Sequence, residues 1–101
     1  MPSAAVAFKA LAEPRRVEIL RLLRGGPRSV GEIAASVEVT QQAASQHLAT
    51  LSQAGLVEAR REGTRAVYSI KPDGFAPVLE FVEWFWDGKL AQLKREVEGK
   101  P

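Results

Sequence analysis

The stretch from Thr40 to Val57 constrains this chain more than any other, because it predicts one helix with two very different faces. Its first residue is a threonine, whose hydroxyl can accept a hydrogen bond from a free amide of the first helical turn. Apolar residues at helical spacing, Ala44, Leu48 and Leu51, form the face that a core would bury. Gly55 is then expected to end the helix in a left-handed conformation.

The opposite face of this helix is polar but carries no formal charge. Its side chains are amides, a hydroxyl and a methyl group, at Gln41, Gln42, Ser45, Gln46 and Ala49. Glutamine pairs well with adenine in a DNA major groove, and serine pairs with several bases. The face therefore predicts a helix that reads base edges. A polar surface that contacts only water is the alternative.

Length and composition narrow the remaining classes. A chain of 101 residues suits one small domain, so residues 1–101 are treated as one. The chain has no cysteine, which excludes thiolate chemistry and fits a cytoplasmic protein. It has no apolar run of membrane-spanning length and no secretion signal, so we expect no membrane partner. The net charge of +2 is small, and the positions of the basic residues matter more than their sum.

Three shorter helices are predicted ahead of the uncharged helix. Ser3 is expected to cap the first, and Pro14 suits the first turn of the second. Ser29 and Glu32 form a capping-box sequence at the start of the third. The third helix meets the uncharged helix through a tight connection, which is the layout of a helix-turn-helix.

After Gly55 the pattern changes from helix to strand. Two short runs, 56–61 and 66–70, are strand-like, and Gly63 lies in the connection between them. The predicted tip carries three arginines, Arg60, Arg61 and Arg65. A basic hairpin directly after such a helix is typical of a wing that contacts phosphates. A hairpin kept soluble by its arginines is the alternative.

The last predicted helix runs from about Asp73, its expected cap, to Glu98. Gly88 marks either a kink or a point of close packing. The helix is apolar over most of its circumference, with Phe81, Phe85 and Trp86 among the large side chains. Burial against a second copy of the chain is the simplest solution for such a surface. A groove for a small apolar ligand is the alternative.

With these elements in place, two segments resemble the ArsR/SmtB family of winged-helix bacterial repressors. They are FKALAEPRRVEILRLL and SVGEIAASVEVTQQAASQHLATLSQAGLVEARREGTRAVYSI. The most specific part is the S-Q-H-L-x-x-L-x-x-A-G-L-V core from Ser45 to Val57, followed by R-x-G and Y-S-I. The resemblance covers nearly the whole chain.

The resemblance implies a mainly α winged helix-turn-helix, with four helices, a β-hairpin and a last helix. It also implies a homodimer held by the first and last helices, so that Val6 and Phe8 would join the aromatic residues of the last helix at the interface. Its members repress transcription through double-stranded operators with two-fold symmetry. Transferred by position, the base-reading residues are Gln41, Gln42, Ser45 and Gln46, and the phosphate-contacting residues are Thr40, Arg60, Arg61 and Arg65.

The chain departs from the metal sensors of that family. Ser29 and Gly31 stand where soft-metal sensors carry cysteines, and the last helix has no histidine. The single histidine, His47, is interpreted as a structural or backbone-contacting residue rather than a metal ligand. The resemblance is therefore to the branch without metal ligands, and we expect neither a metal nor a cofactor.

Two other functional classes are less favoured. An enzyme would need a phosphate loop, a nucleophile beside a base or a set of metal ligands, and the sequence shows none of these patterns. A winged helix that binds only proteins has no need for arginines on both flanks of the uncharged helix, at Arg15, Arg16 and Arg28 and on the wing. The sequence leaves open the operator, the regulated genes, the existence of an effector, and repression against activation.

Overall fold

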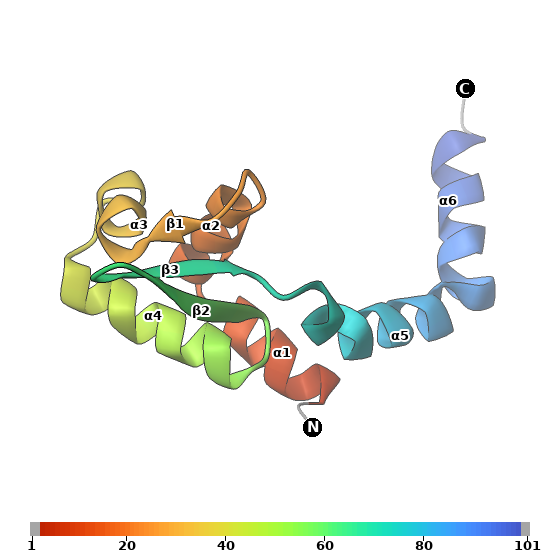
Figure 1. Ribbon diagram of the computed structural model, residues 1–101. Helices are drawn as coiled ribbons and strands as arrows, with labels where there is room; N and C mark the ends of the chain where they lie inside the picture. The colour runs from red at the N-terminus through yellow and green to blue at the C-terminus, as the bar shows by residue number, and fades with distance from the viewer. Residues whose placement is uncertain (1–2, 100–101) are drawn as a thin grey trace.

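The computed structural model describes residues 3–99 (Figure 1). The first helices are α1 (Ala4–Leu11), α2 (Pro14–Leu23), α3 (Val30–Ser36) and α4 (Gln41–Gln53). The strands are β1 (Arg28–Ser29), β2 (Val57–Glu62) and β3 (Arg65–Ile70). A 3₁₀ turn at Pro72–Phe75 leads into α5 (Ala76–Phe85), and the segment Trp86–Leu90 leads into α6 (Ala91–Glu98). The predicted class, mainly helical with a β-hairpin, is confirmed.

The predicted helix starts are confirmed by side-chain hydrogen bonds to free backbone amides. The Ser3 hydroxyl accepts from the amide of Val6, and the Thr40 hydroxyl accepts from that of Ala43 at 3.0 Å. The capping box of α3 is complete in both directions. The Ser29 amide donates to the Glu32 carboxylate at 2.8 Å, and the Glu32 amide donates to the Ser29 hydroxyl at 3.3 Å.

The core lies where α1 to α4 meet the base of the hairpin. The largest fully buried side chains come from α2, α3 and α4 and from the residue just before β2, and they are Ile19, Ile33, Leu48, Leu51 and Leu56. Ala44, at the predicted inner face of α4, is also buried. The apolar face predicted for α4 therefore packs inward, and its polar face is left on the surface.

A three-stranded antiparallel sheet with the order β1-β3-β2 replaces the predicted two-stranded hairpin. Arg28 pairs with Tyr68 and Ser29 with Val67, so Arg28 and the capping residue Ser29 form a short strand that was not predicted. A strand of two residues has no periodicity of its own, and it exists only because β3 offers it hydrogen-bonding partners.

The chain is fixed to the end of α4 directly after the wing. The amide of Lys71 donates to the carbonyl of Leu56 at 2.9 Å. Gly74 then lies so close to Gly55 that a Cβ atom added to it would stand 1.6 Å from the Gly55 carbonyl oxygen. This contact sets the point from which α5 starts.

The last helix differs from the prediction in two ways. Asp73 lies within the 3₁₀ turn, and α5 begins at Ala76 without a side-chain cap. The helix also does not continue to residue 98, because Gly88 has a φ of 95° and breaks it. The kink expected at Gly88 is thus a true break, after which α6 extends away from the other helices (Figure 1). Across residues 3–99 no helix is long and apolar enough to cross a membrane.

Candidate nucleic-acid interface

The outer surface of α4 is a row of exposed, uncharged side chains. Gln42, Gln46, Ala49 and Gln53 recur at helical spacing on this side and are all exposed. Gln41 and Ser45 are also exposed, on the side that faces the hairpin. A face of this kind offers hydrogen-bond donors and acceptors without charge.

A hollow of about 400 Å³ lies between the wing, the start of α3 and the first residue of α4. Gln41 at the start of α4 lines it together with Arg61 and Arg65 of the hairpin. Ser29, Gly31 and Thr64 also line it, and no pattern in the sequence predicts a surface role for them. The structure therefore brings one predicted base-reading residue and two predicted phosphate-contacting residues to a single place.

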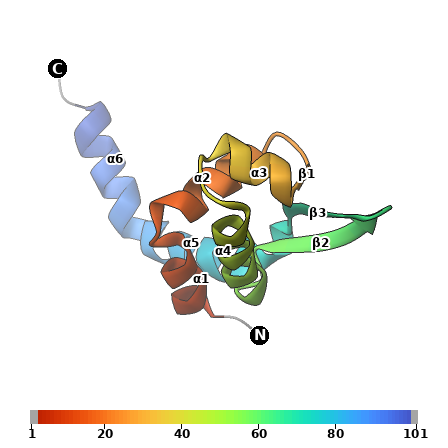
Figure 2. The same cartoon turned by 90° about the vertical axis from the view of Figure 1, so that its left-hand side faces the viewer.

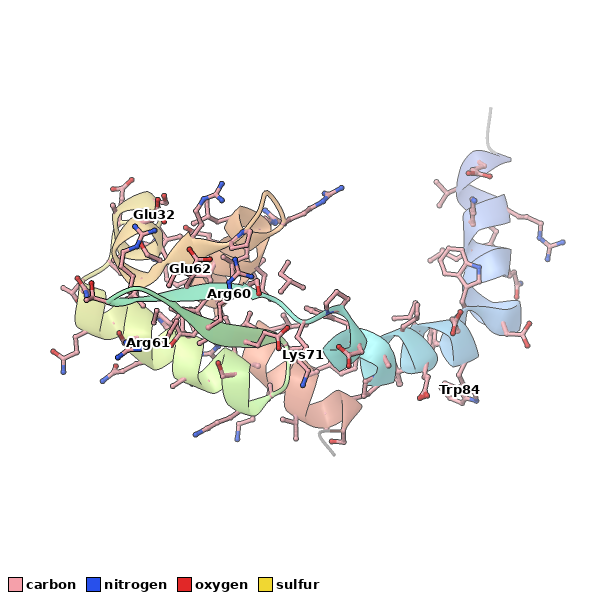
Figure 3. All side chains as sticks on the ribbon, viewed as in Figure 1. Glu32, Arg60, Arg61, Glu62, Lys71 and Trp84 are labelled. Carbon is pink, nitrogen blue, oxygen red and sulfur yellow. The ribbon has the colours of Figure 1, made fainter. Side chains whose placement is uncertain are left out.

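The wing extends beyond the helices, as the view down α4 shows (Figure 2). The arginines of the wing differ in their contacts: Arg60 pairs with a carboxylate, whereas Arg61 and Arg65 line the hollow. Arg60 donates to the Glu62 carboxylate from Nε at 2.9 Å and from Nη2 at 2.6 Å (Figure 3). Strand alternation places residues 60 and 62 on the same face of β2 and residue 61 on the other, so the sequence contained this signal. An exposed ion pair of this type contributes only about 0–1 kcal/mol, so Glu62 holds Arg60 weakly.

Glu32 lies close enough to Arg65, which lines the hollow, for the arginine charge to act on its carboxylate. The hydrogen bond from the Ser29 backbone amide lowers the pKa of Glu32, and the Ser29 hydroxyl acts in the same direction. The positive charges of Arg65 and Arg28 lower this pKa further. The α3 cap therefore carries a carboxylate close to the basic wing.

Two of the arginines predicted to flank α4 are held by contacts within the chain. Arg15 forms an exposed ion pair with Glu18 at 3.2 Å. Arg16 is turned inward, where its Nε donates to the carbonyl of Ala10 and its Nη1 lies 3.4 Å from His47 Nδ1. Because a guanidinium only donates, His47 accepts through Nδ1. This contact agrees with a structural role for His47.

Three of the residues predicted for dimerisation, Phe8, Phe81 and Phe85, form an exposed aromatic group. Phe8 of α1 packs edge-on against Phe81 of α5, with ring centroids 5.4 Å apart, and Phe81 stacks on Phe85 at 6.3 Å. These two α5 rings remain 44% and 42% exposed, and Trp84 beside them is 73% exposed and points away from the fold (Figure 3). Trp86 is 44% exposed, whereas Val6 lies elsewhere and lines a cavity against α4.

These features define a winged helix-turn-helix domain. Its recognition helix, α4, presents an uncharged surface, and its wing is basic. Residues 13–59 match the model of the arsR family of bacterial regulatory proteins. Over 94 residues the chain is 42% identical to the HTH-type transcriptional regulator Rv2034 of Mycobacterium tuberculosis, covering 93% of this chain and 88% of that protein. This chain therefore belongs to the ArsR family, and it is a DNA-binding transcriptional regulator rather than an enzyme.

Two further comparisons bear on how such proteins act. The transcriptional activator HlyU of Vibrio cholerae is 38% identical over 79 residues, which cover 78% of this chain and 73% of that protein. The solution structure of the homodimeric winged helix-turn-helix domain Mb0332, residues 1–100, from Mycobacterium bovis is 43% identical. It covers 82% of this chain and 77% of its own, with a TM-score of 0.68.

Proposed function

We propose that this regulator is a homodimeric repressor that binds double-stranded operators with two-fold symmetry and does not respond to metal ions. In this proposal residues 1–101 act as one winged helix-turn-helix domain, dimerised through its terminal helices. Its place of action would be the cytoplasm, where bacterial DNA lies. Control of its own gene is one form that such repression would take.

The proposal rests on one observation: uncharged amides on α4 and arginines on the wing lie on the same surface. Gln42 and Gln46 stand outward on a helix without charge, as base readout requires. Arg61 and Arg65 line the hollow beside the start of that helix, where they would neutralise backbone phosphate. Thr40 caps α4 with its hydroxyl and remains exposed beside them.

The exposed apolar side chains of α1 and α5 support the dimer. A monomer in water rarely exposes a contiguous group of rings of this size without a partner. Two copies joined there would present two recognition helices, and half-sites about 34 Å apart would follow from one turn of DNA between them. The homodimeric state of the Mycobacterium bovis domain supports a dimer for this chain too.

The test is selection of bound DNA from a random duplex library, followed by gel retardation with the recovered site. The proposal expects two inverted half-sites and one dimer bound to each site. Recovery of no preferred sequence, or of a single half-site bound by a monomer, would overturn it.

The direction of regulation needs a separate measurement, because the relative in Vibrio cholerae is named an activator. A reporter placed behind the recovered site is expected to lose expression when this chain is produced. A rise in expression would replace repression with activation and leave DNA binding intact.

A further inference from the structure

A second cavity, of about 260 Å³, lies between α1, α2 and the end of α4, at some distance along α4 from the Gln41 hollow. Its apolar lining comes from Val6, Ala10 and Ala54. Its polar lining comes from Thr50 and Gln53, and two cations, Lys9 and Arg16, complete it. An apolar pocket with a few converging polar groups is the usual form of a small-molecule site.

The charged side chains that line this cavity are all positive. Within residues 3–99 neither Lys9 nor Arg16 forms an ion pair with a carboxylate, although Arg16 is partly buried. A partly buried guanidinium without a counter-charge favours an anion, since each cation gains from a nearby negative charge.

We propose that this cavity binds a small organic carboxylate with a short apolar tail, and that its occupant weakens DNA binding. The carboxylate would lie between Lys9 and Arg16, and the tail would cover Val6, which is 44% exposed, above the buried Ala10 and Ala54. A volume somewhat below the common range of about 300–1,000 Å³ suits a ligand with few heavy atoms.

The geometry of Arg16 connects this site to α4. Its Nε is already engaged by the carbonyl of Ala10, so a bidentate carboxylate takes the edge formed by Nη1 and Nη2. Nη1 is also the atom that lies 3.4 Å from His47 Nδ1. A charged ligand on that edge pulls on the guanidinium, and with it on the Nη1 group that makes this long contact between α2 and the recognition helix. The occupied and empty states therefore differ in how α4 is held.

The binding experiment uses the intact chain labelled with ¹⁵N and sodium hexanoate as the probe, with hexanamide as the uncharged control. Hexanoate is expected to shift the amide signals of residues 6–10 and 50–54, and hexanamide to leave them unchanged. Shifts elsewhere, equal shifts with hexanamide, or no shifts at millimolar concentration would overturn the site. The last result is also expected if a partner protomer fills the cavity through Val6.

Variants of the chain distinguish binding of hexanoate in this cavity from a general attraction of hexanoate to positive charge. Lys9→Gln changes an exposed residue that the fold does not need, and it should weaken hexanoate binding about tenfold. Arg16→Lys should weaken it similarly, but this variant also loses the hydrogen bond to Ala10, so Lys9→Gln decides. The matched control is Arg15→Gln, a neighbouring arginine outside the cavity, which should bind hexanoate like the unmodified chain. Equal binding by Lys9→Gln and Arg15→Gln would reject the site.

The effect on DNA rests on the proposed function, whereas hexanoate binding does not. Hexanoate should lower affinity for the selected site at least about fivefold at constant ionic strength, and the loss should vanish in Lys9→Gln. Unchanged DNA affinity with hexanoate bound would refute the coupling. Absence of DNA binding under all conditions would refute the proposed function instead, and the NMR result would still report on the cavity.

Discussion

The backbone of Gly74 lies directly on that of Gly55, so that a Cβ atom added to Gly74 would stand 1.6 Å from the Gly55 carbonyl oxygen. The two residues join the end of the recognition helix to the start of α5. The position of the apolar α5 surface relative to α4 therefore depends on a contact that only glycine permits.

Gly74→Ala is expected to lower the free energy of unfolding by at least about 2 kcal/mol, because two backbone segments must separate. Urea denaturation measures this change. Gly31→Ala is the matched control, since a Cβ atom there meets nothing within 4 Å. Alanine in place of a helical glycine should stabilise α3 by about 0.5–1 kcal/mol. Equal stability of the two variants would contradict the close contact.

Gln46→Ala is expected to cost about 1–3 kcal/mol of binding free energy on the selected site and to relax sequence preference at one position of each half-site. The reason is that the exposed Gln46 amide is a base-reading group in the proposed complex. Competition binding against single-base variants of the site measures both effects. Gln92→Ala makes the same change on α6 and should leave DNA binding as it was.

Arg61→Ala should weaken binding to all DNA sequences and reduce the dependence of log K on log salt by about one unit, because one phosphate contact is lost. Glu62→Gln should have the opposite effect, since it frees Arg60 from its ion pair. Fluorescence anisotropy across a salt series measures the two slopes. A loss of sequence preference in Arg61→Ala would instead assign this arginine to base readout.

Phe85→Ala is expected to weaken dimerisation by about 2 kcal/mol or more, as truncation of a central interface aromatic does. Phe85 is 42% exposed in the single chain, so the folded protomer should lose less than the dimer. Sedimentation velocity gives the dimer dissociation constant, and DNA affinity should fall with it. A stable, folded monomer of the unmodified chain at micromolar concentration would rule out the proposed interface.

DNA binding is expected to change less than about tenfold when zinc, nickel, copper or arsenite is added at low micromolar levels, or when a chelator is present. Residues 3–99 contain no group of three or more His, Cys, Asp and Glu side chains able to share an ion. Gel retardation with the selected site measures the effect of each metal. A larger change that chelation reverses would falsify the metal-independent reading.

Local features could be predicted from the sequence alone. The caps at Ser3, Ser29 and Thr40 depend on residues within four positions of one another, and the sequence leaves Gly88 open between a kink and a point of close packing. The two strand-like runs of the hairpin and the spacing of the inner face of α4 are equally local. Such patterns predict secondary structure because their hydrogen bonds and side-chain contacts form between near neighbours in the chain.

Contacts between distant residues were decided only by the tertiary structure. Two residues before α3 became a strand because β3 lies beside them, and Arg16 turned to His47 because α2 packs on α4. Packing of the wing beside the starts of α3 and α4 placed Gln41 beside Arg61 and Arg65. Sequence showed which side chains could bind bases or phosphates. Which of these side chains share a surface depended on packing between elements far apart in the sequence. Local sequence patterns do not show which elements pack together.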